Sequence, residues 1–226
     1  SERAEAMLSD NAGRDLVSYA ELAFDDDYKI RAYRVNTVCN LGAYNSQFAQ
    51  PIQSELFSKV LMGTYDVQTS WLNVKGVYTN TTQVDAYRGA GRPEASYVIE
   101  RLVDEAAKEI GLDPAELRRR NILSSEDTPY KTPLVFTYDC GEFDKNMERA
   151  LSESRYDDFS ARREEAASRG MLRGIGIANA IEAAAAPGPE FGEIRFSTDG
   201  TTTVLMGTKN QGQGHETMYK QIVGER

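Results

Sequence analysis

The clearest hydrophobic pattern in the chain lies between Pro93 and Ile110, where apolar side chains recur every three or four residues. Proline suits the first turn of a helix, and Gly111 supplies a residue that ends one, so the pattern predicts a single long helix. A shorter helix is predicted from Pro114 to Asn121, because Asp113 is a good N-cap residue. Residues 143–169 predict one or two solvent-facing helices with charged faces.

Alternation of apolar and polar residues predicts β-strands on both sides of this helical region. The predicted extended segments are residues 18–24, 29–39, 71–84, 174–181, 193–197 and 203–206. Asp25–Asp27 offers a turn between the first two segments, and Asp199 with Gly200 offers a turn between the last two. Strands and helices that come in separate stretches predict an α+β fold, with mixed, mostly antiparallel sheets and helices packed on them.

Composition and charge narrow the class of protein. Of 226 residues, 40% are apolar and 27% are charged, which is ordinary for a globular domain. The net charge of -9 repels polyanions, and basic residues are scattered apart from Arg118–Arg120, which we expect at a helix end in surface ion pairs. These observations exclude a nucleic-acid-binding protein. No apolar run approaches the length of a membrane span. The two distant cysteines fit a reducing cytoplasm best, so a cytoplasmic location is expected.

Cysteine and histidine are too few for several kinds of site. Cys39 and Cys140 lie far apart without a Cys-x-x-Cys spacing, which argues against a disulfide framework, a zinc site or an iron–sulfur site within this chain. His215 is the only histidine, so a mechanism that needs two or three imidazoles is excluded.

Residues 86–94 form a glycine-rich loop ahead of the long predicted helix. Gly89 and Gly91 permit close backbone approach, and Arg88 and Arg92 flank them. Backbone N–H groups at a helix start, joined by a guanidinium, suit a phosphate or an oxo-anion. The alternative is a tight turn whose glycines serve the backbone geometry and whose arginines lie in solvent. The residue spacing does not exclude it, because the loop matches neither a dinucleotide fingerprint nor a P-loop.

Residues 207–217 form a second glycine-rich loop, between a predicted strand and a predicted helix. Gly212 and Gly214 expose backbone N–H groups, and the carboxamides of Gln211 and Gln213 offer both donors and acceptors. This combination suits a large polar cofactor with a heteroaromatic ring. The alternative is a polar turn capped by His215. Two such loops in one chain favour a ligand.

Both loops resemble those of a known family. Residues 86–123 closely resemble a region in the large subunits of molybdenum hydroxylases, the group of xanthine dehydrogenases, aldehyde oxidases and aerobic carbon monoxide dehydrogenases. Residues 207–217 are similar to the second cofactor loop of that group. The resemblance implies part of a larger molybdopterin-binding subunit. Residues 1–170 would belong to a first molybdopterin-binding domain, and residues 171–226 would begin a second.

The resemblance also implies a cofactor and partners. The cofactor is molybdenum held by molybdopterin, the cytosine dinucleotide being one of its forms. Arg88 and Gly89 would lie on the metal's substrate side, with Arg88 catalytic. The residues that would hold the pterin and its phosphate are Gln211, Gly212, Gln213 and Gly214. Such enzymes hydroxylate an aldehyde or aromatic heterocycle with oxygen derived from water and pass electrons to 2Fe–2S and FAD groups on partner subunits.

Several family features differ or are missing here. The complete enzymes are expected to form dimers of heterotrimers, and their glutamate base comes from a segment beyond these residues, so the chain alone is expected to be inactive. Carbon monoxide dehydrogenases place a copper-binding cysteine at Gly89, and xanthine-type enzymes place a phenylalanine at Ala90. Small residues there predict open space for an organic substrate. The alternatives are a carbon monoxide dehydrogenase-like subunit, a phosphate- or nucleotide-binding module without redox activity, and a catalytically silent assembly part.

Overall fold

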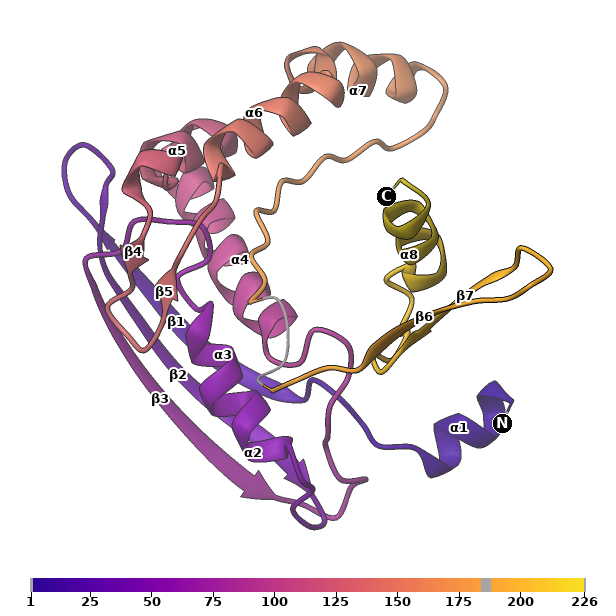
Figure 1. Cartoon of the computed structure of the whole chain (residues 1–226). Coiled ribbons are helices and arrows are strands. Elements are labelled where there is room, and N and C mark those ends of the chain that lie inside the picture. Colours follow the sequence, from indigo (N-terminus) through magenta and orange to yellow (C-terminus); the bar gives the residue numbers. More distant parts are fainter. Residues whose placement is uncertain (1, 184–187, 226) are drawn as a thin grey trace. The chain divides into compact units, whose positions relative to one another are not determined.

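The computed structural model describes residues 2–183 and 188–225. The chain divides into two compact units, Ser1–Ala183 and Ala184–Arg226 (Figure 1). The first unit begins with a short helix, α1 (Arg3–Ser9), none of whose residues is buried. No helix in the described part of the chain is long and apolar enough to cross a membrane.

The first unit is built on a three-stranded sheet with the order β1-β2-β3. β1 (Leu16–Phe24) and β2 (Ile30–Gly42) are antiparallel, as the predicted hairpin requires, whereas β3 (Thr69–Tyr78) runs parallel to β2. The aspartate turn forms because Asp25 Oδ1 accepts hydrogen bonds from the backbone N–H groups of Asp27 and Lys29, at 3.0 and 2.9 Å.

The parallel pair needs a crossover, and an irregular helix supplies it. The crossover consists of α2 (Ala49–Pro51), one π-helical turn η1 (Ile52–Leu56) and α3 (Phe57–Lys59). Two longer helices follow the sheet. α4 (Arg92–Ile110) starts after Gly91 and ends at a left-handed Gly111, and α5 (Pro114–Asn121) is capped by the Asp113 carboxylate. Both helices match the predictions.

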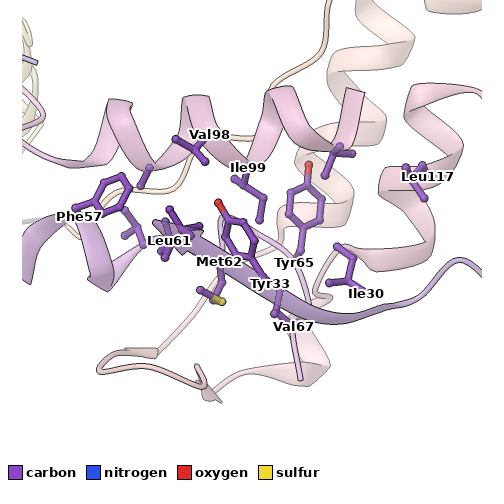
Figure 2. Packing of buried hydrophobic residues seen from close by; sticks show 14 of the residues in the cluster. Ile30, Tyr33, Phe57, Leu61, Met62, Tyr65, Val67, Val98, Ile99 and Leu117 are labelled. Atoms are coloured by element: carbon purple, nitrogen blue, oxygen red, sulfur yellow. The ribbon is translucent and has the colours of Figure 1, made fainter. Parts of the chain in front are cut away.

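One hydrophobic cluster joins these elements (Figure 2). Ile30, Tyr33 and Val35 face it from β2, and Phe57 is one of the crossover side chains that pack in the same cluster. The apolar stripe of α4 supplies the other wall, including a completely buried Ile99. The core therefore fixes the start of α4, and with it the first glycine-rich loop.

Arg118 corrects the expectation for the arginine triplet. Arg119 and Arg120 form surface ion pairs as predicted, but Arg118 is fully buried. Its guanidinium lies 2.7 Å from Glu100 Oε2 and 2.8 Å from Asp104 Oδ1, both on α4. A buried guanidinium is tolerated only when carboxylates neutralise it and its donors are bonded. Arg118 therefore joins α5 to α4 from inside the unit.

The rest of the first unit is partly as predicted. The remaining elements are η2 (Ser125–Asp127), the hairpin β4 (Tyr130–Lys131) and β5 (Thr137–Tyr138), α6 (Phe143–Glu153), η3 (Tyr156–Asp158) and α7 (Phe159–Ser168). The helices of residues 143–169 are confirmed. The strand predicted at residues 174–181 is wrong. Side chains, not a neighbouring strand, bind this backbone, and Arg118 Nη2 donates to the carbonyl of Ile177 at 3.0 Å.

The second unit is small. β6 (Gly192–Phe196) and β7 (Thr202–Met206) form the predicted antiparallel hairpin, and α8 (His215–Gly224) follows a loop. The turn is closed by Asp199 Oδ1, which accepts from the N–H of Thr201 at 2.9 Å. None of the described residues of this unit is buried. With mixed and antiparallel sheets and packed helices, the chain has the expected α+β fold.

Candidate functional site

The first glycine-rich loop is a tight double turn at the start of α4. The N–H of Ala90 donates to the carbonyl of Tyr87 at 2.7 Å, and the N–H of Arg92 donates to the carbonyl of Gly89 at 3.0 Å. Gly89, Ala90 and Gly91 have φ values of +91°, +24° and +89°. Such angles are costly for any residue but glycine, so the loop conformation explains the two glycines.

The loop is also packed against its surroundings. A Cβ atom at Gly89 would lie 2.8 Å from Pro93 Cγ, and one at Gly91 would lie 2.6 Å from the carbonyl oxygen of Ile52 and 2.8 Å from the nitrogen of Phe57. The π-helical turn therefore fits directly against Gly91. The expected open space beside these glycines does not exist at either position.

Arg14 holds this loop from a distant part of the sequence. Its Nη2 donates to the carbonyl of Arg88, and its guanidinium lies over the Tyr87 ring, 4.7 Å from the centroid. Its Nε lies 3.7 Å from a carboxylate oxygen of the buried Glu94. No local motif marks Arg14 in the sequence, and this contact was not predicted.

The two arginines that flank the glycines have different surroundings. Arg88 has an exposed side chain. Arg92 is mostly buried, its Nη1 donates to the carbonyl of Ala90 at 3.0 Å, and its Nε lies 2.8 Å from Glu182 Oε1. Arg92 is therefore mostly inaccessible to a ligand, whereas the exposed side chain of Arg88 is accessible from solvent.

The second glycine-rich loop is shaped by its own carboxamides. Gln213 Oε1 accepts from the N–H of Gln211 at 2.5 Å, and Gln213 Nε2 donates to the carbonyl of Lys209 at 3.2 Å. Asn210 Oδ1 accepts from the N–H of Gly212 at 3.1 Å. In this conformation the Gln213 side chain braces the loop from within.

The donor groups of this loop fit a phosphate-bearing polar cofactor. Gly214 has a φ of +79° and caps α8, and no described atom lies within 4 Å of the position where its Cβ would be. A helix leaves its first backbone N–H groups without partners inside the helix, so the start of α8 presents donors beside open surface. Lys209 adds a positive charge.

His215 has a structural neighbour in α8. Its ring centroid lies 5.1 Å from that of Tyr219, and the Tyr219 hydroxyl is hydrogen bonded to Thr208 at 2.8 Å. These contacts tie the beginning of the loop to the helix. Within residues 2–183 and 188–225, no group of three or more histidine, cysteine, aspartate or glutamate side chains could hold a metal ion.

The surroundings of both cysteines favour the protonated thiol. Burial, reinforced by the charge of Glu94, raises the pKa of the Cys39 thiol to about 12. The charge of Asp139, and the hydrogen bond that the Cys140 thiol donates to its carboxylate, raise the pKa of Cys140. Both cysteines are free. The raised pKa values disfavour the thiolate form, which is the form that a soft metal binds.

The predicted site residues fall into two groups. Arg88 and Gly89 lie in the loop before α4, in the first unit, and Gln211, Gly212, Gln213 and Gly214 lie together in the loop before α8, in the second unit. Each group therefore precedes a helix. Among residues with contacts to the first loop, Arg14 and Glu182 had no signal of their own in the sequence.

Comparisons with known proteins identify the family. Models of the molybdopterin cofactor-binding domain match residues 1–122 and 149–226. The chain is 33% identical, over 99% of its length, to the 6-hydroxypseudooxynicotine dehydrogenase complex subunit gamma of Paenarthrobacter nicotinovorans, and 36% identical, over 98% of its length, to the carbon monoxide dehydrogenase large chain of Hydrogenophaga pseudoflava. It spans 29% and 30% of those proteins, respectively.

A solved structure agrees with the sequence relatives. Quinoline 2-oxidoreductase from Pseudomonas putida 86 superposes with a TM-score of 0.79 at 27% identity, covering 99% of this chain and 30% of that one. The fold and the two matched domain models therefore agree, and the chain belongs to the family of molybdopterin cofactor-binding domains.

Proposed function

We propose that this chain is the molybdopterin-binding part of a large subunit that hydroxylates an aldehyde or an aromatic heterocycle with oxygen derived from water. The observation that carries the proposal is the pair of glycine turns, each directly before a helix, in a chain matched by two molybdopterin-binding domain models. From the family resemblance we further propose that residues 1–170 belong to a first sequence domain and that residues 171–226 begin a second, while residues 171–183 pack within the first compact unit.

The residues of the two loops receive different roles in this proposal. Arg88 and Gly89 face the substrate side of the metal, and residues 211–214 hold the pterin and its phosphate. When bound, the cofactor supplies two-electron redox chemistry and makes a water-derived oxygen nucleophilic near neutral pH. The guanidinium of Arg88 stabilises negative charge that develops on a substrate heteroatom, while the contact from Arg14 to its carbonyl oxygen holds its backbone in place.

The proposed subunit works with others. Electrons leave through 2Fe–2S and FAD groups on partner subunits, in a cytoplasmic dimer of heterotrimers. The similarity to a protein named as a subunit of a dehydrogenase complex supports such partners.

The first alternative is a carbon monoxide dehydrogenase-like subunit, which the similarity to two carbon monoxide dehydrogenase large chains favours. The solved Cu,Mo-CO dehydrogenase contains copper, a soft metal that prefers thiolate ligands, so a copper site here would need a suitably placed cysteine. Gly89 has no side chain, and Pro93 occupies the direction that one would take. The protonated Cys39 thiol lies on β2, outside this loop. These observations favour an organic substrate. The second alternative is a phosphate- or nucleotide-binding module without redox activity.

The test uses the complete subunit expressed with its partner subunits. We expect reduction of an electron-accepting dye with an aldehyde or an aromatic heterocycle, and molybdenum without copper in the purified complex. Dye reduction that depends on carbon monoxide, with copper equal to molybdenum, would instead establish the first alternative. A purified complex that holds nucleotide but neither molybdenum nor pterin would establish the second.

A further inference from the structure

Residues 171–183 form an extended segment, here called the strap, that follows α7 and runs beside α4 (Figure 1). Asn179 Nδ2 donates to the sulfur of Met147 at 3.4 Å, and Ile181 packs on the main hydrophobic cluster. An arginine binds the strap near its middle and another binds it at its end. The strap is therefore fixed to the first unit by side-chain contacts between Ile177 and Ala183.

The first arginine is the buried Arg118. Its Nη2 donates to the carbonyl of Ile177 at 3.0 Å and to Glu100 Oε2 at 2.7 Å. Because the same guanidinium also lies 2.8 Å from Asp104 Oδ1, its loss would leave two carboxylates without their buried partner. Arg118 is thus part of the fold of the first unit.

The second arginine, Arg92, bridges the strap and the first glycine-rich loop. Its Nη1 donates to the carbonyl of Ala90 at 3.0 Å, and its Nη2 donates to the carbonyl of Ala183 at 3.3 Å. Its Nε lies 2.8 Å from Glu182 Oε1 but out of line with the N–H bond, so this contact is ionic and not a directed hydrogen bond. Ala183 is the last residue of the first unit. One side chain therefore contacts both the loop and the end of that unit.

The ion pair is poorly suited to stabilising the fold. The Glu182 side chain is 52% exposed, whereas that of Arg92 is 15% exposed. Burial raises the pKa of Glu182, and the positive charge of Arg92 offsets that effect only in part. Half-exposed ion pairs contribute little free energy of folding, and their geometry matters more. The contacts of Arg92 therefore orient the backbone.

We propose that Arg92 and Glu182 form a latch that fixes the end of the first unit against the first glycine-rich loop and so holds that loop in its conformation. This inference rests on the proposed function for its consequence, which is cofactor retention. The latch itself is a property of the first unit. Arg92 and Glu182 are positioning residues in this account, and neither contacts the reacting atoms.

The test compares Arg92→Ala, Glu182→Ala and the double variant in the complete subunit with its partners. The exchange rates of the Ala90 and Arg92 amides, whose hydrogen bonds close the loop turns, measure directly how firmly the latch holds the loop. We expect about tenfold faster exchange in each single variant, and about tenfold faster loss of molybdenum and pterin, as for other residues that orient ligands without touching them. The double variant should be no worse than Arg92→Ala, because the loss of Arg92 already removes its ion pair with Glu182.

The matched control is Glu153→Ala, which removes the exposed pair with Arg149 on α6 and should change none of these rates. The melting temperatures of all variants should stay close to that of the wild type. If Glu182→Ala fails to fold, Glu182→Gln removes the charge and keeps the shape. Unchanged amide exchange at Ala90 and Arg92 would overturn the latch. So would a double variant in which the increases in exchange rate of the two single variants multiply. A wild-type complex without molybdenum overturns the proposed function, while the exchange data still decide the latch.

Discussion

Substitution of Gly91 by alanine tests the packing of the first loop most sharply. The residue has a φ of +89°, and a left-handed conformation costs a side-chain-bearing residue about 1–2 kcal/mol. The new Cβ would also lie 2.6 Å from the carbonyl oxygen of Ile52 and 2.8 Å from the nitrogen of Phe57, so backbone must move. Overpacking of this kind costs roughly 1–3 kcal/mol. The two contributions together predict a loss of about 2–5 kcal/mol.

Gly111→Ala is the matched control for this substitution. Gly111 has a φ of +72° at the other end of the same helix, and no described atom lies within 4 Å of its Cβ position. It should therefore show only the conformational cost of about 1–2 kcal/mol. Native-state hydrogen exchange of the α4 amides in the complete subunit measures both values as opening free energies. A Gly91→Ala loss no larger than that of Gly111→Ala would refute the fit of the π-helical turn against the loop.

Three further predictions concern single side chains. Arg118→Ala should lower the opening free energy of α5 by about 3–5 kcal/mol, as measured by hydrogen exchange, because it leaves the buried Glu100 carboxylate without its partner; a change below 1 kcal/mol would contradict this. Arg88→Ala should lower kcat about 10²–10³-fold in the complete enzyme while metal analysis finds molybdenum retained, and molybdenum lost in step with activity would make Arg88 an anchor. Iodoacetamide at pH 8 should label exposed Cys140 but not Cys39, whose burial raises its pKa to about 12, and equal labelling of the native protein would contradict that environment.

Sequence patterns predicted the elements whose signals are local. The apolar period and Gly111 located α4, and Asp25 and Asp199 located two turns, because each signal lies within the element that it forms. The strand prediction for residues 174–181 was wrong because it also used only a local signal. Alternating small and β-branched residues suit any extended backbone, and only the neighbouring side chains decide that residues 174–181 lie along helices and not within a sheet.

The candidate site was predictable only in part. The glycines at positions 89 and 91 marked a tight turn, but their packing partners at Pro93 and Ile52 are set by the tertiary fold. Arg14 lies 74 positions from Arg88, whose carbonyl oxygen it binds. Arg118 can be buried because it pairs with Glu100 and Asp104, which lie 18 and 14 positions away. Long-range charge pairing of this kind leaves no periodic trace in a sequence. The cofactor roles of both loops remain predictions.

The central claim, that the two loops hold a molybdenum pterin, is tested most directly by cofactor stoichiometry. The complete subunit, purified with its partners, should contain molybdenum and pterin in equimolar amounts. Gly214→Ala should reduce both together, because it places a methyl group on the open surface at the start of α8. A well-folded wild-type complex that contains neither molybdenum nor pterin would contradict the account.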